Sequence, residues 1–476
     1  MRHAQEFTPV EVELSLSPGL PQISFLGMPD PFIRESVTRI KSALRAQGFD
    51  FPKAQQVLVQ LRPSHLKKTS RGLDLAVAAA LIWETEQAKR PDNFSDLTIY
   101  GELSLKGEVF VPDDIDDSEE CLSERDVVVT GKDLKSFNGN LWKLKDLRAL
   151  AQEPEFERSY RELAKSVRPA SPYRDFTEKQ AELISVLAAG GHSCLLVGTP
   201  GSGKSATAES VSAFLPAPTP DEWKSIRKVA SMFHKTPTWR PNVVVHHSIT
   251  SLAMVGGTSQ MRPGEITRAH GGTLIMDELL EFRPNVQDSI REPFESGKIE
   301  IARQGKFVEM PAQFQLLATS NLCRCGNYLP KDTSNCRCDG YRLRQYQERF
   351  SGPMIDRFSI VSLFFPEEAT KGKKVSSDEI LKWVTIAGEQ RAARGQVLRN
   401  GELTLAELSQ FLNTNDSCID AFTKDIRSHR SRIQVMQVAR TFADLDNSEK
   451  TKREHFARAA QMTIQSREKL LKSLAG

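Results

Sequence analysis

The sequence predicts an α/β protein made of three consecutive parts, and three patterns along the chain support this division. Residues 1–155 mix short strands rich in β-branched residues with one amphipathic and one apolar helix. Residues 177–366 alternate strands with helices, which is typical of a parallel sheet. Residues 367–476 show helical periodicity and no convincing strand. We therefore expect an N-terminal α/β module, a parallel-sheet core and a C-terminal α-helical domain.

Local patterns predict the individual elements at the two ends of the chain. In the first part, apolar or alternating runs predict strands at residues 10–16, 57–61 and 126–130 and a hairpin at 97–111. Helices are predicted there at 36–47 and 73–83. Polar composition with proline indicates a linker at 156–176. In the last part, helical periodicity is present at 378–393, 403–413, 430–445 and 451–474.

The composition is typical of a folded protein in a reducing compartment. The chain has 476 residues, of which 39% are hydrophobic and 26% charged. No apolar run reaches the ~20 residues that cross a bilayer, and the first residues lack the pattern of a signal peptide. Seven cysteines, an odd number, exclude a complete set of intrachain disulfides. We expect a cytoplasmic protein without a membrane partner.

The overall charge is nearly balanced, with 64 Lys and Arg against 61 Asp and Glu. Residues 113–126 form an acidic run, which we interpret as a solvated loop. It offsets a basic excess in the helical segment 427–476, which contains 11 Lys and Arg but only 5 Asp and Glu. That basic face is either solvated or in contact with DNA phosphates, and the second interpretation predicts a steep salt dependence. Any DNA binding must therefore depend on local patches.

The strongest motif is a phosphate-binding loop with the pattern GxxxxGK[ST]. It consists of Gly198, Thr199, Pro200, Gly201, Ser202, Gly203, Lys204 and Ser205. An apolar strand precedes the loop and a helix follows it, which is the context that the motif requires. The glycines let backbone N–H groups surround phosphates, Lys204 can reach the β- and γ-phosphates, and the Ser205 hydroxyl can bind Mg²⁺.

Polar residues follow three further segments of the core. Asp277 and Glu278 follow a buried strand, so we expect Asp277 to hold Mg²⁺ and Glu278 to orient and activate the attacking water. An isolated acidic pair can also cap a helix, but the phosphate loop favours the catalytic interpretation. Asn321 ends another strand, where its amide can bond the water or the γ-phosphate. Arg357 follows a short helix, and an arginine considered alone is more often a surface ion pair.

The order of these elements resembles that of AAA+ ATPases, and the flanking segments resemble the magnesium-chelatase-like branch, specifically the ComM/YifB family. The likeness covers nearly the whole chain. In the core it rests on four cysteines within residues 323–338, described below, and on five short segments. These segments are AAGGH at 188–192, HHS at 246–248, VGG at 255–257, RPGEI at 262–266 and DELLEFR at 277–283.

This resemblance implies ATP and Mg²⁺ as ligands and assigns roles to three residues. Asn321 corresponds to the sensor-1 residue. Arg357 corresponds to the arginine finger, which enters the ATP site of a neighbouring subunit. Arg430 corresponds to the sensor-2 arginine, although Gln434 and Gln437 stand where the family commonly has basic residues.

The N-terminal part also resembles the ComM/YifB family, at 19–21, 27–30, 34–36, 72–75 and 101–107. The implied fold is a Lon-protease-like module, similar to domain 2 of ribosomal protein S5. A protease of this type needs a Ser–Lys dyad, but Asp74 stands at the serine position and the lysine position falls near Ser118. No suitable lysine accompanies Ser70. We therefore expect a module for assembly or DNA contact rather than for proteolysis.

Two histidines, His246 and His247, are adjacent ahead of the acidic pair. On a strand they would point to opposite faces, so one metal ion could not easily take both. The resemblance instead assigns them to an insert that faces the central pore of a ring. Their role stays open.

Four cysteines form a CxC-x10-CxC cluster within residues 323–338. They are Cys323, Cys325, Cys336 and Cys338. Two close pairs of thiolates can close a tetrahedral Zn²⁺ site, although CxxC is the more usual spacing. Disulfides and free thiols are the alternatives, and we favour structural zinc. The arginines around the cluster can face DNA or a neighbouring subunit.

The resemblance implies a homo-oligomeric ring, expected to be a hexamer, that hydrolyses ATP and moves along single-stranded or branched DNA. The implied role is branch migration during recombination of incoming DNA in natural transformation. A chelatase subunit that drives metal insertion into a porphyrin, a protein-remodelling factor and an ATP-binding switch are the alternatives. The motifs do not specify DNA over protein, and they leave ring size, polarity, junction preference and loading partner open.

Overall fold

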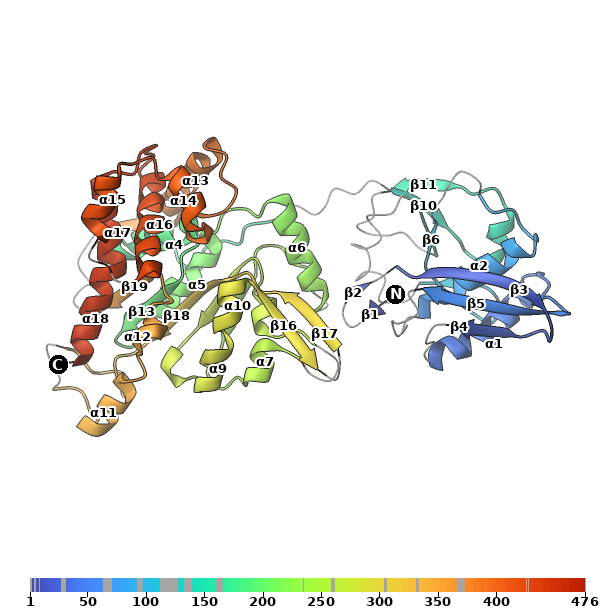
Figure 1. Ribbon diagram of the computed structural model, residues 1–476, viewed down its shortest axis with the longest axis horizontal. Helices are drawn as coiled ribbons and strands as arrows, with labels where there is room; N and C mark the ends of the chain where they lie inside the picture. Colours follow the sequence, from blue (N-terminus) through green and yellow to red (C-terminus); the bar gives the residue numbers. More distant parts are fainter. Residues whose placement is uncertain are drawn as a thin grey trace. The chain divides into compact units, whose positions relative to one another are not determined.

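The computed structural model describes the chain except for residues 1, 4–5, 8, 27–30, 63–70, 92–96, 112–126, 132–138, 160–165, 234, 258–261, 304–305, 331–333, 366–372, 425, 427 and 476. The acidic run, Ser70 and Ser118 thus lie outside the described residues. The chain forms two compact units, Met1–Lys165 and Ser166–Gly476 (Figure 1). The mixed α/β fold, the parallel sheet and the helical C-terminal region are confirmed. Within the described residues, no helix is long and apolar enough to span a bilayer.

In its described residues, the first unit contains a three-stranded and a four-stranded mixed sheet, two short strand pairs, and helices that pack against them. One sheet has the order β3-β5-β4, built from β3 (Glu11–Pro18), β5 (Gln55–Arg62) and β4 (Ile23–Leu26). The other has the order β11-β10-β9-β6, built from β11 (Phe156–Ser159), β10 (Gly139–Lys143), β9 (Val127–Thr130) and β6 (Thr98–Ile99). Helices α1 (Pro31–Ala46) and α2 (Asp74–Glu84) contribute apolar side chains to the core of this unit.

The hairpin predicted over 97–111 is only partly formed. Strands β7 (Glu102–Leu103) and β8 (Val109–Phe110) pair antiparallel, whereas β6 pairs in parallel with β9. Strand β11 also lies inside the segment that we interpreted as a linker, where it pairs with β10. Strands of two to four residues carry too little periodicity to indicate their partners.

The second unit is built on a five-stranded parallel sheet with the order β14-β15-β18-β13-β19. Its strands are β14 (Asn242–Val245), β15 (Thr273–Met276), β18 (Gln315–Ser320), β13 (Cys194–Gly198) and β19 (Ile360–Phe364). All residues of the four strands from β15 to β19 are buried, as expected for a parallel sheet covered on both faces. Every strand therefore ends at the same edge of the sheet.

Helices cover both faces of this sheet (Figure 1). One face packs against α4 (Glu178–Gly190), α5 (Lys204–Phe214), α13 (Ser377–Ala393), α16 (His429–Leu445) and α17 (Arg453–Ala460). The other packs against shorter helices, including α8 (Glu265–Arg268) and α9 (Pro284–Ser289), and against α18 (Ser466–Ala475). Alternate residues of β13 divide between the two cores, Leu196 on one side and Leu195 on the other.

The C-terminal region contains the predicted helices and two elements that the periodicity did not indicate. The expected segments correspond to α13, α14 (Leu405–Phe411), α16 and the pair α17 and α18, which a π-helical turn, Gln461–Gln465, connects. Helix α15 (Asp416–Thr423) is additional. So is β20 (Lys374–Ser376), which pairs antiparallel with β12 (Asp175–Thr177) and corrects the expectation of no strand in this region. Three-residue strands show no measurable alternation.

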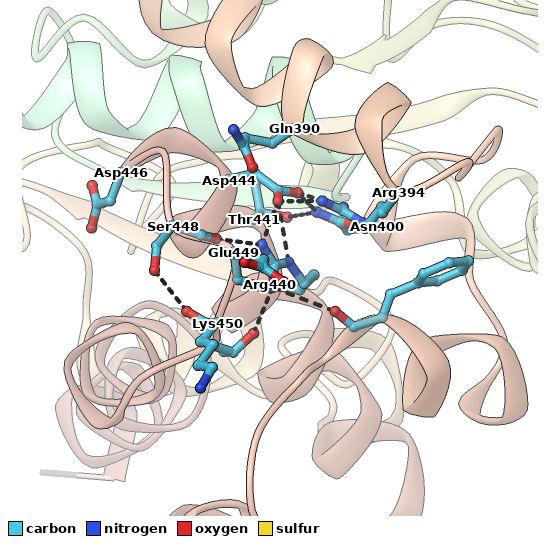
Figure 2. Close-up of polar contacts among 12 residues, drawn as sticks. Gln390, Arg394, Asn400, Arg440, Thr441, Asp444, Asp446, Ser448, Glu449 and Lys450 are labelled. Atoms are coloured by element: carbon cyan, nitrogen blue, oxygen red, sulfur yellow. Dashed lines mark hydrogen bonds and ion pairs between the residues drawn. The ribbon is translucent and has the colours of Figure 1, made fainter.

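A buried ion network holds the C-terminal helices together (Figure 2). Asp444 accepts hydrogen bonds from Arg394 Nη1 and Nη2 at 2.6 and 2.8 Å, from Arg440 Nη2 at 2.7 Å and from Asn400 Nδ2 at 2.8 Å. Arg440 is 1% exposed and Asp444 is 2% exposed. One buried arginine, Arg440, and one partly buried arginine, Arg394, therefore share one carboxylate.

We expect Asp444→Ala to destabilise the protein by about 3–5 kcal/mol, because it leaves Arg440 buried without its counter-charge and also removes the partner of the partly buried Arg394. Urea unfolding followed by circular dichroism measures the effect. The matched control is Asp420→Ala, an exposed aspartate on α15, which we expect to change stability by no more than ~0.5 kcal/mol. Equal stability of the two variants would contradict this account of the network.

Candidate nucleotide-binding site

The phosphate-binding loop connects β13 with α5 at the carboxyl edge of the sheet. Gly198 is the last residue of β13. A Cβ atom on this residue would lie 1.9 Å from the Phe364 carbonyl oxygen, so no larger residue fits. Gly201 and Gly203 have φ angles of 73° and 88°, which favour glycine. A Cβ at Gly201 would meet no atom within 4 Å, so the tip of the loop borders open space. The loop therefore has the backbone shape that wraps a phosphate.

Lys204 lies at the start of α5 with its ammonium group turned back into the loop. Its Nζ donates to the carbonyl oxygens of Gly198 at 3.1 Å and Thr199 at 2.6 Å, and to Asn321 Oδ1 at 3.2 Å. Burial lowers the pKa of Lys204 to about 8, while Asp277 and Glu278 raise it. A bound phosphate would add negative charge next to this buried ammonium and stabilise its charged form.

The Thr199 hydroxyl indicates that the loop fits a phosphate. Its Oγ1 is buried and has no hydrogen-bond partner within the described part of the chain. A buried hydroxyl without a partner is unfavourable, and a phosphate oxygen would satisfy it. The loop thus fits a phosphate group by its shape, its cation and its unpaired donor.

Asp277 lies between two hydroxyl groups from neighbouring elements. Ser205 Oγ donates to Asp277 Oδ1 at 2.8 Å, and Thr319 Oγ1 donates to the same oxygen at 2.6 Å. These hydroxyl and carboxylate oxygens are the ligand type that Mg²⁺ prefers. Sequence reasoning missed Thr319, although a polar residue inside a fully buried strand was a usable signal.

Glu278 has a left-handed backbone, with φ 57° and ψ 54°, which is uncommon for a residue other than glycine. Its N–H donates to Thr319 Oγ1 at 3.0 Å, which fixes the turn. The side chain is 49% exposed, and its Oε2 lies 3.7 Å from His247 Nδ1. A partly solvated carboxylate of this kind can hold a water molecule and accept its proton.

The two histidines differ from the arrangement that adjacency on a strand predicts. Strand β14 ends at Val245, so His246 and His247 lie in the turn that follows. Their ring centroids are 4.0 Å apart, so the rings lie on the same side of the backbone instead of on opposite faces. His246 Nδ1 is 2.9 Å from Ser248 Oγ, whereas His247 faces Glu278.

Arg357 and Arg430 come together at a different place, on the carboxylate of Glu295. Arg430 Nη2 lies 2.8 Å from Glu295 Oε1, and Arg357 Nε lies 3.7 Å from the same atom. The hydrogen bond from Arg430 is the main reason why the pKa of Glu295 is lowered. Arg357 Nη1 also donates to the Pro353 carbonyl oxygen at 2.6 Å. The two arginines thus share one carboxylate, and sequence reasoning missed this common partner.

The four cysteines of the cluster are brought together with their sulfur atoms all within 4.8 Å of one another. Cys323 Sγ lies 3.4 Å from Cys325 Sγ and 3.8 Å from Cys336 Sγ. The Tyr328 N–H donates to Cys323 Sγ at 3.3 Å. Four sulfur atoms converging in this way fit a tetrahedral metal ion.

In the N-terminal unit, Asp74 takes part in a buried ion pair. Its side chain is fully buried at the start of α2, where Oδ2 accepts from Arg39 Nε at 2.8 Å. Arg39 Nη2 donates to Ser36 Oγ at 3.0 Å. Asp74 thus stabilises the packing of α1 against α2, and it offers no nucleophile.

The fold and the phosphate loop define a P-loop nucleotide-binding protein with an Asp–Glu pair after β15, which β18 separates from the strand of the loop. Comparison with protein families agrees. Residues 176–371 match magnesium chelatase, subunit ChlI, residues 12–113 match subunit ChlI of Mg-chelatase, and residues 374–463 match the C-terminal part of subunit ChlI.

Sequence similarity to three individual proteins identifies the branch of this family to which the chain belongs. YifB of Salmonella typhimurium is 30% identical over 483 residues, which cover 95% of this chain and 93% of YifB. Competence protein ComM of Haemophilus influenzae is 29% identical, over 94% and 93% of the two chains. The magnesium-chelatase 38 kDa subunit of Cereibacter sphaeroides is 24% identical, over 30% of this chain and 49% of the subunit. The chain belongs to the ComM/YifB family of magnesium-chelatase-like AAA+ proteins.

Proposed function

We propose that the protein is an ATP-hydrolysing ring motor, with six subunits, that acts on DNA in the cytoplasm as a branch-migration helicase during recombination of incoming DNA. The observation that supports the ring is the position of Arg357, which shares the carboxylate of Glu295 with Arg430, while the Lys204 side chain of the phosphate loop contacts Asn321. Such an arginine serves a nucleotide only if a neighbouring subunit presents one. The name of the relative ComM, a competence protein, supports DNA as the polymer that is moved.

In this proposal each subunit binds ATP through its own loop and completes the site of its neighbour. Lys204 and the backbone N–H groups from Gly198 to Ser205 hold the phosphates, and Asn321 senses the γ-phosphate. Ser205 and Asp277 would hold Mg²⁺, which neutralises phosphate charge. Glu278 orients the attacking water and accepts its proton. Arg357 and Arg430 reach the neighbouring nucleotide, where Arg357 stabilises the charge of the transition state.

The N-terminal unit has a proposed role of its own. We interpret it as a Lon-protease-like module without proteolytic chemistry, because Asp74 is committed to Arg39. With proteolysis excluded, we propose that this unit contributes to assembly of the ring or to contact with DNA.

We also propose that the cysteine cluster holds one structural Zn²⁺. The purified wild-type protein is then expected to contain one zinc per chain by plasma mass spectrometry. Cys336→Ser should lose it and melt at a lower temperature, because a structural zinc contributes directly to folding. Cys418→Ser, a free cysteine outside the cluster, is the matched control and should keep its zinc. Wild-type protein without stoichiometric zinc would refute the assignment.

ATP hydrolysis in the presence of different polymers tests the proposed function. The rate of phosphate release is measured with single-stranded, forked and four-way DNA, with an unfolded protein, and with porphyrin and Mg²⁺. We expect DNA, but neither unfolded protein nor porphyrin, to raise the rate of ATP hydrolysis. Lys204→Ala should show no such stimulation, because it lacks the phosphate-binding cation. Stimulation by porphyrin would favour a chelatase subunit, and stimulation by unfolded protein would favour a remodelling factor.

A further inference from the structure

Arg467 is a buried arginine on α18 that contacts no residue of the phosphate loop in the described structure. It is only 6% exposed. Its Nη1 donates to Asp356 Oδ1 at 3.0 Å, and its Nη2 donates to the Phe358 carbonyl oxygen. These two partners are the residues on either side of Arg357. One guanidinium group therefore holds the chain immediately before and immediately after the proposed arginine finger.

Helix α16 holds the same segment from a second direction. Ser428 Oγ donates to Asp356 Oδ2 at 3.2 Å, Ser431 Oγ donates to Asp356 Oδ1 at 3.3 Å, and Gln434 Nε2 donates to the Asp356 carbonyl oxygen at 3.2 Å. These three side chains are three residues apart, so they lie on one face of the helix. Arg467 connects to this face, because Nη1 also bonds Ser431 Oγ at 2.8 Å and Nη2 bonds Gln434 Oε1 at 2.6 Å.

The backbone of Arg357 itself is fixed from the sheet. Ser193 Oγ donates to the Arg357 carbonyl oxygen at 3.2 Å and accepts from the Ser359 N–H at 2.9 Å. Ser193 directly precedes β13, which leads into the phosphate loop. All three carbonyl groups from Asp356 to Phe358 are thus bonded by side chains that come from other elements.

The chemistry of arginine suits this position. Burying a guanidinium group is unfavourable unless its donors are paired, and an apolar residue of similar size would often stabilise the fold equally well. A planar fork, however, can hold a carboxylate and a carbonyl group at once in fixed directions, which the single ammonium of lysine cannot do. The Arg357 side chain is 22% exposed, so the held segment leaves part of this side chain accessible at the surface.

We propose that Arg467 is a positioning residue for Arg357: it fixes the segment Asp356–Phe358 so that the finger is held ready for the ATP site of the neighbouring subunit. This inference rests on the proposed function, because it requires that Arg357 acts on a neighbour. Arg467 then affects hydrolysis in the next subunit and leaves the nucleotide site of its own subunit intact.

The first test compares nucleotide binding with turnover in the full chain. In Arg467→Met we expect kcat for ATP to fall on the order of 100-fold, since displacing a reactive group by about 1 Å has that effect, while the affinity for a fluorescent ADP analogue stays within about 2-fold. Arg467→Lys keeps the buried charge and should lose less, about 10-fold. Lys472→Met, an exposed lysine on the same helix, is the matched control and should retain wild-type turnover.

The second test mixes subunits and separates positioning from a general structural role. Arg467→Met subunits keep an intact ATP site but lack a placed finger, whereas Lys204→Ala subunits keep the finger but lack the ATP site. Mixing them should restore hydrolysis at least ~10-fold above either variant alone, because each supplies what the other lacks. Mixing Arg467→Met with Arg357→Ala should restore nothing, because both lack the finger.

The outcomes distinguish the two levels of the proposal. Wild-type protein that hydrolyses no ATP refutes the proposed function and the role of Arg467 with it. Active wild-type protein with an equally active Arg467→Met variant refutes the role of Arg467 alone. So does a variant whose ADP affinity falls as steeply as its turnover, or a mixture with Lys204→Ala that shows no recovery.

Discussion

A Glu278→Gln variant is expected to bind ATP as tightly as the wild type and to hydrolyse it on the order of 10²–10⁴-fold more slowly. Glutamine has the same shape and keeps an oxygen that can hold water, but it cannot accept a proton. The left-handed turn and its bond to Thr319 stay intact, because the bond involves the backbone N–H. Single-turnover phosphate release and binding of a fluorescent ATP analogue measure the two quantities separately.

The matched control for this variant is Glu300→Gln, on the hairpin strand β16 (Lys298–Arg303) outside the site. It should retain wild-type turnover. Hydrolysis by Glu278→Gln at more than about a tenth of the wild-type rate would mean that another group accepts the proton. Loss of ATP binding together with turnover would instead indicate that Glu278 contributes to the phosphate site.

Arg357→Ala is expected to reduce kcat on the order of 10³-fold and to leave ADP affinity nearly unchanged. The physical reason is that a finger stabilises charge that develops only in the transition state, while the ground-state nucleotide is held by the phosphate loop. Steady-state kinetics at saturating ATP and titration with a fluorescent ADP analogue test the split.

Arg342→Ala is the control for this change, since Arg342 is an arginine on α11 (Gly340–Gln347) whose side chain is 78% exposed. It should behave like the wild type. An Arg357→Ala protein that loses nucleotide binding and turnover equally would exclude the finger assignment. The same protein should regain activity when mixed with Lys204→Ala subunits, and failure to do so would argue against action on a neighbour.

Local patterns account for the parts of the site that sequence alone predicted. The loop from Gly198 to Ser205 depends on glycine spacing between a strand and a helix, and all of that information lies within a few residues. Asp277 and Asn321 follow from apolar strands that end in a polar residue, because parallel strands end at one edge of the sheet. The cysteine cluster follows from its spacing alone. Each of these needed no knowledge of distant contacts.

The parts that sequence did not predict depend on contacts between distant residues. Arg467 meets Asp356 across 111 positions, and nothing near either residue indicates the other. Glu295 joins Arg357 and Arg430 although it lies on a helix between the acidic pair and the cysteine cluster. The pairing of β12 with β20 joins the two ends of the sheet domain through strands too short to show alternation. Side-chain networks of this kind are fixed by tertiary packing.

Movement of a DNA junction tests the central claim most directly. A four-way junction with homologous arms, labelled with a donor and an acceptor dye, is incubated with the full chain and ATP, and strand exchange is followed by fluorescence. We expect the junction to migrate with ATP and to stay in place without ATP, with Glu278→Gln or with Lys204→Ala. The account would be contradicted by a wild-type protein that hydrolyses ATP at a rate no DNA increases and that leaves the junction unmoved.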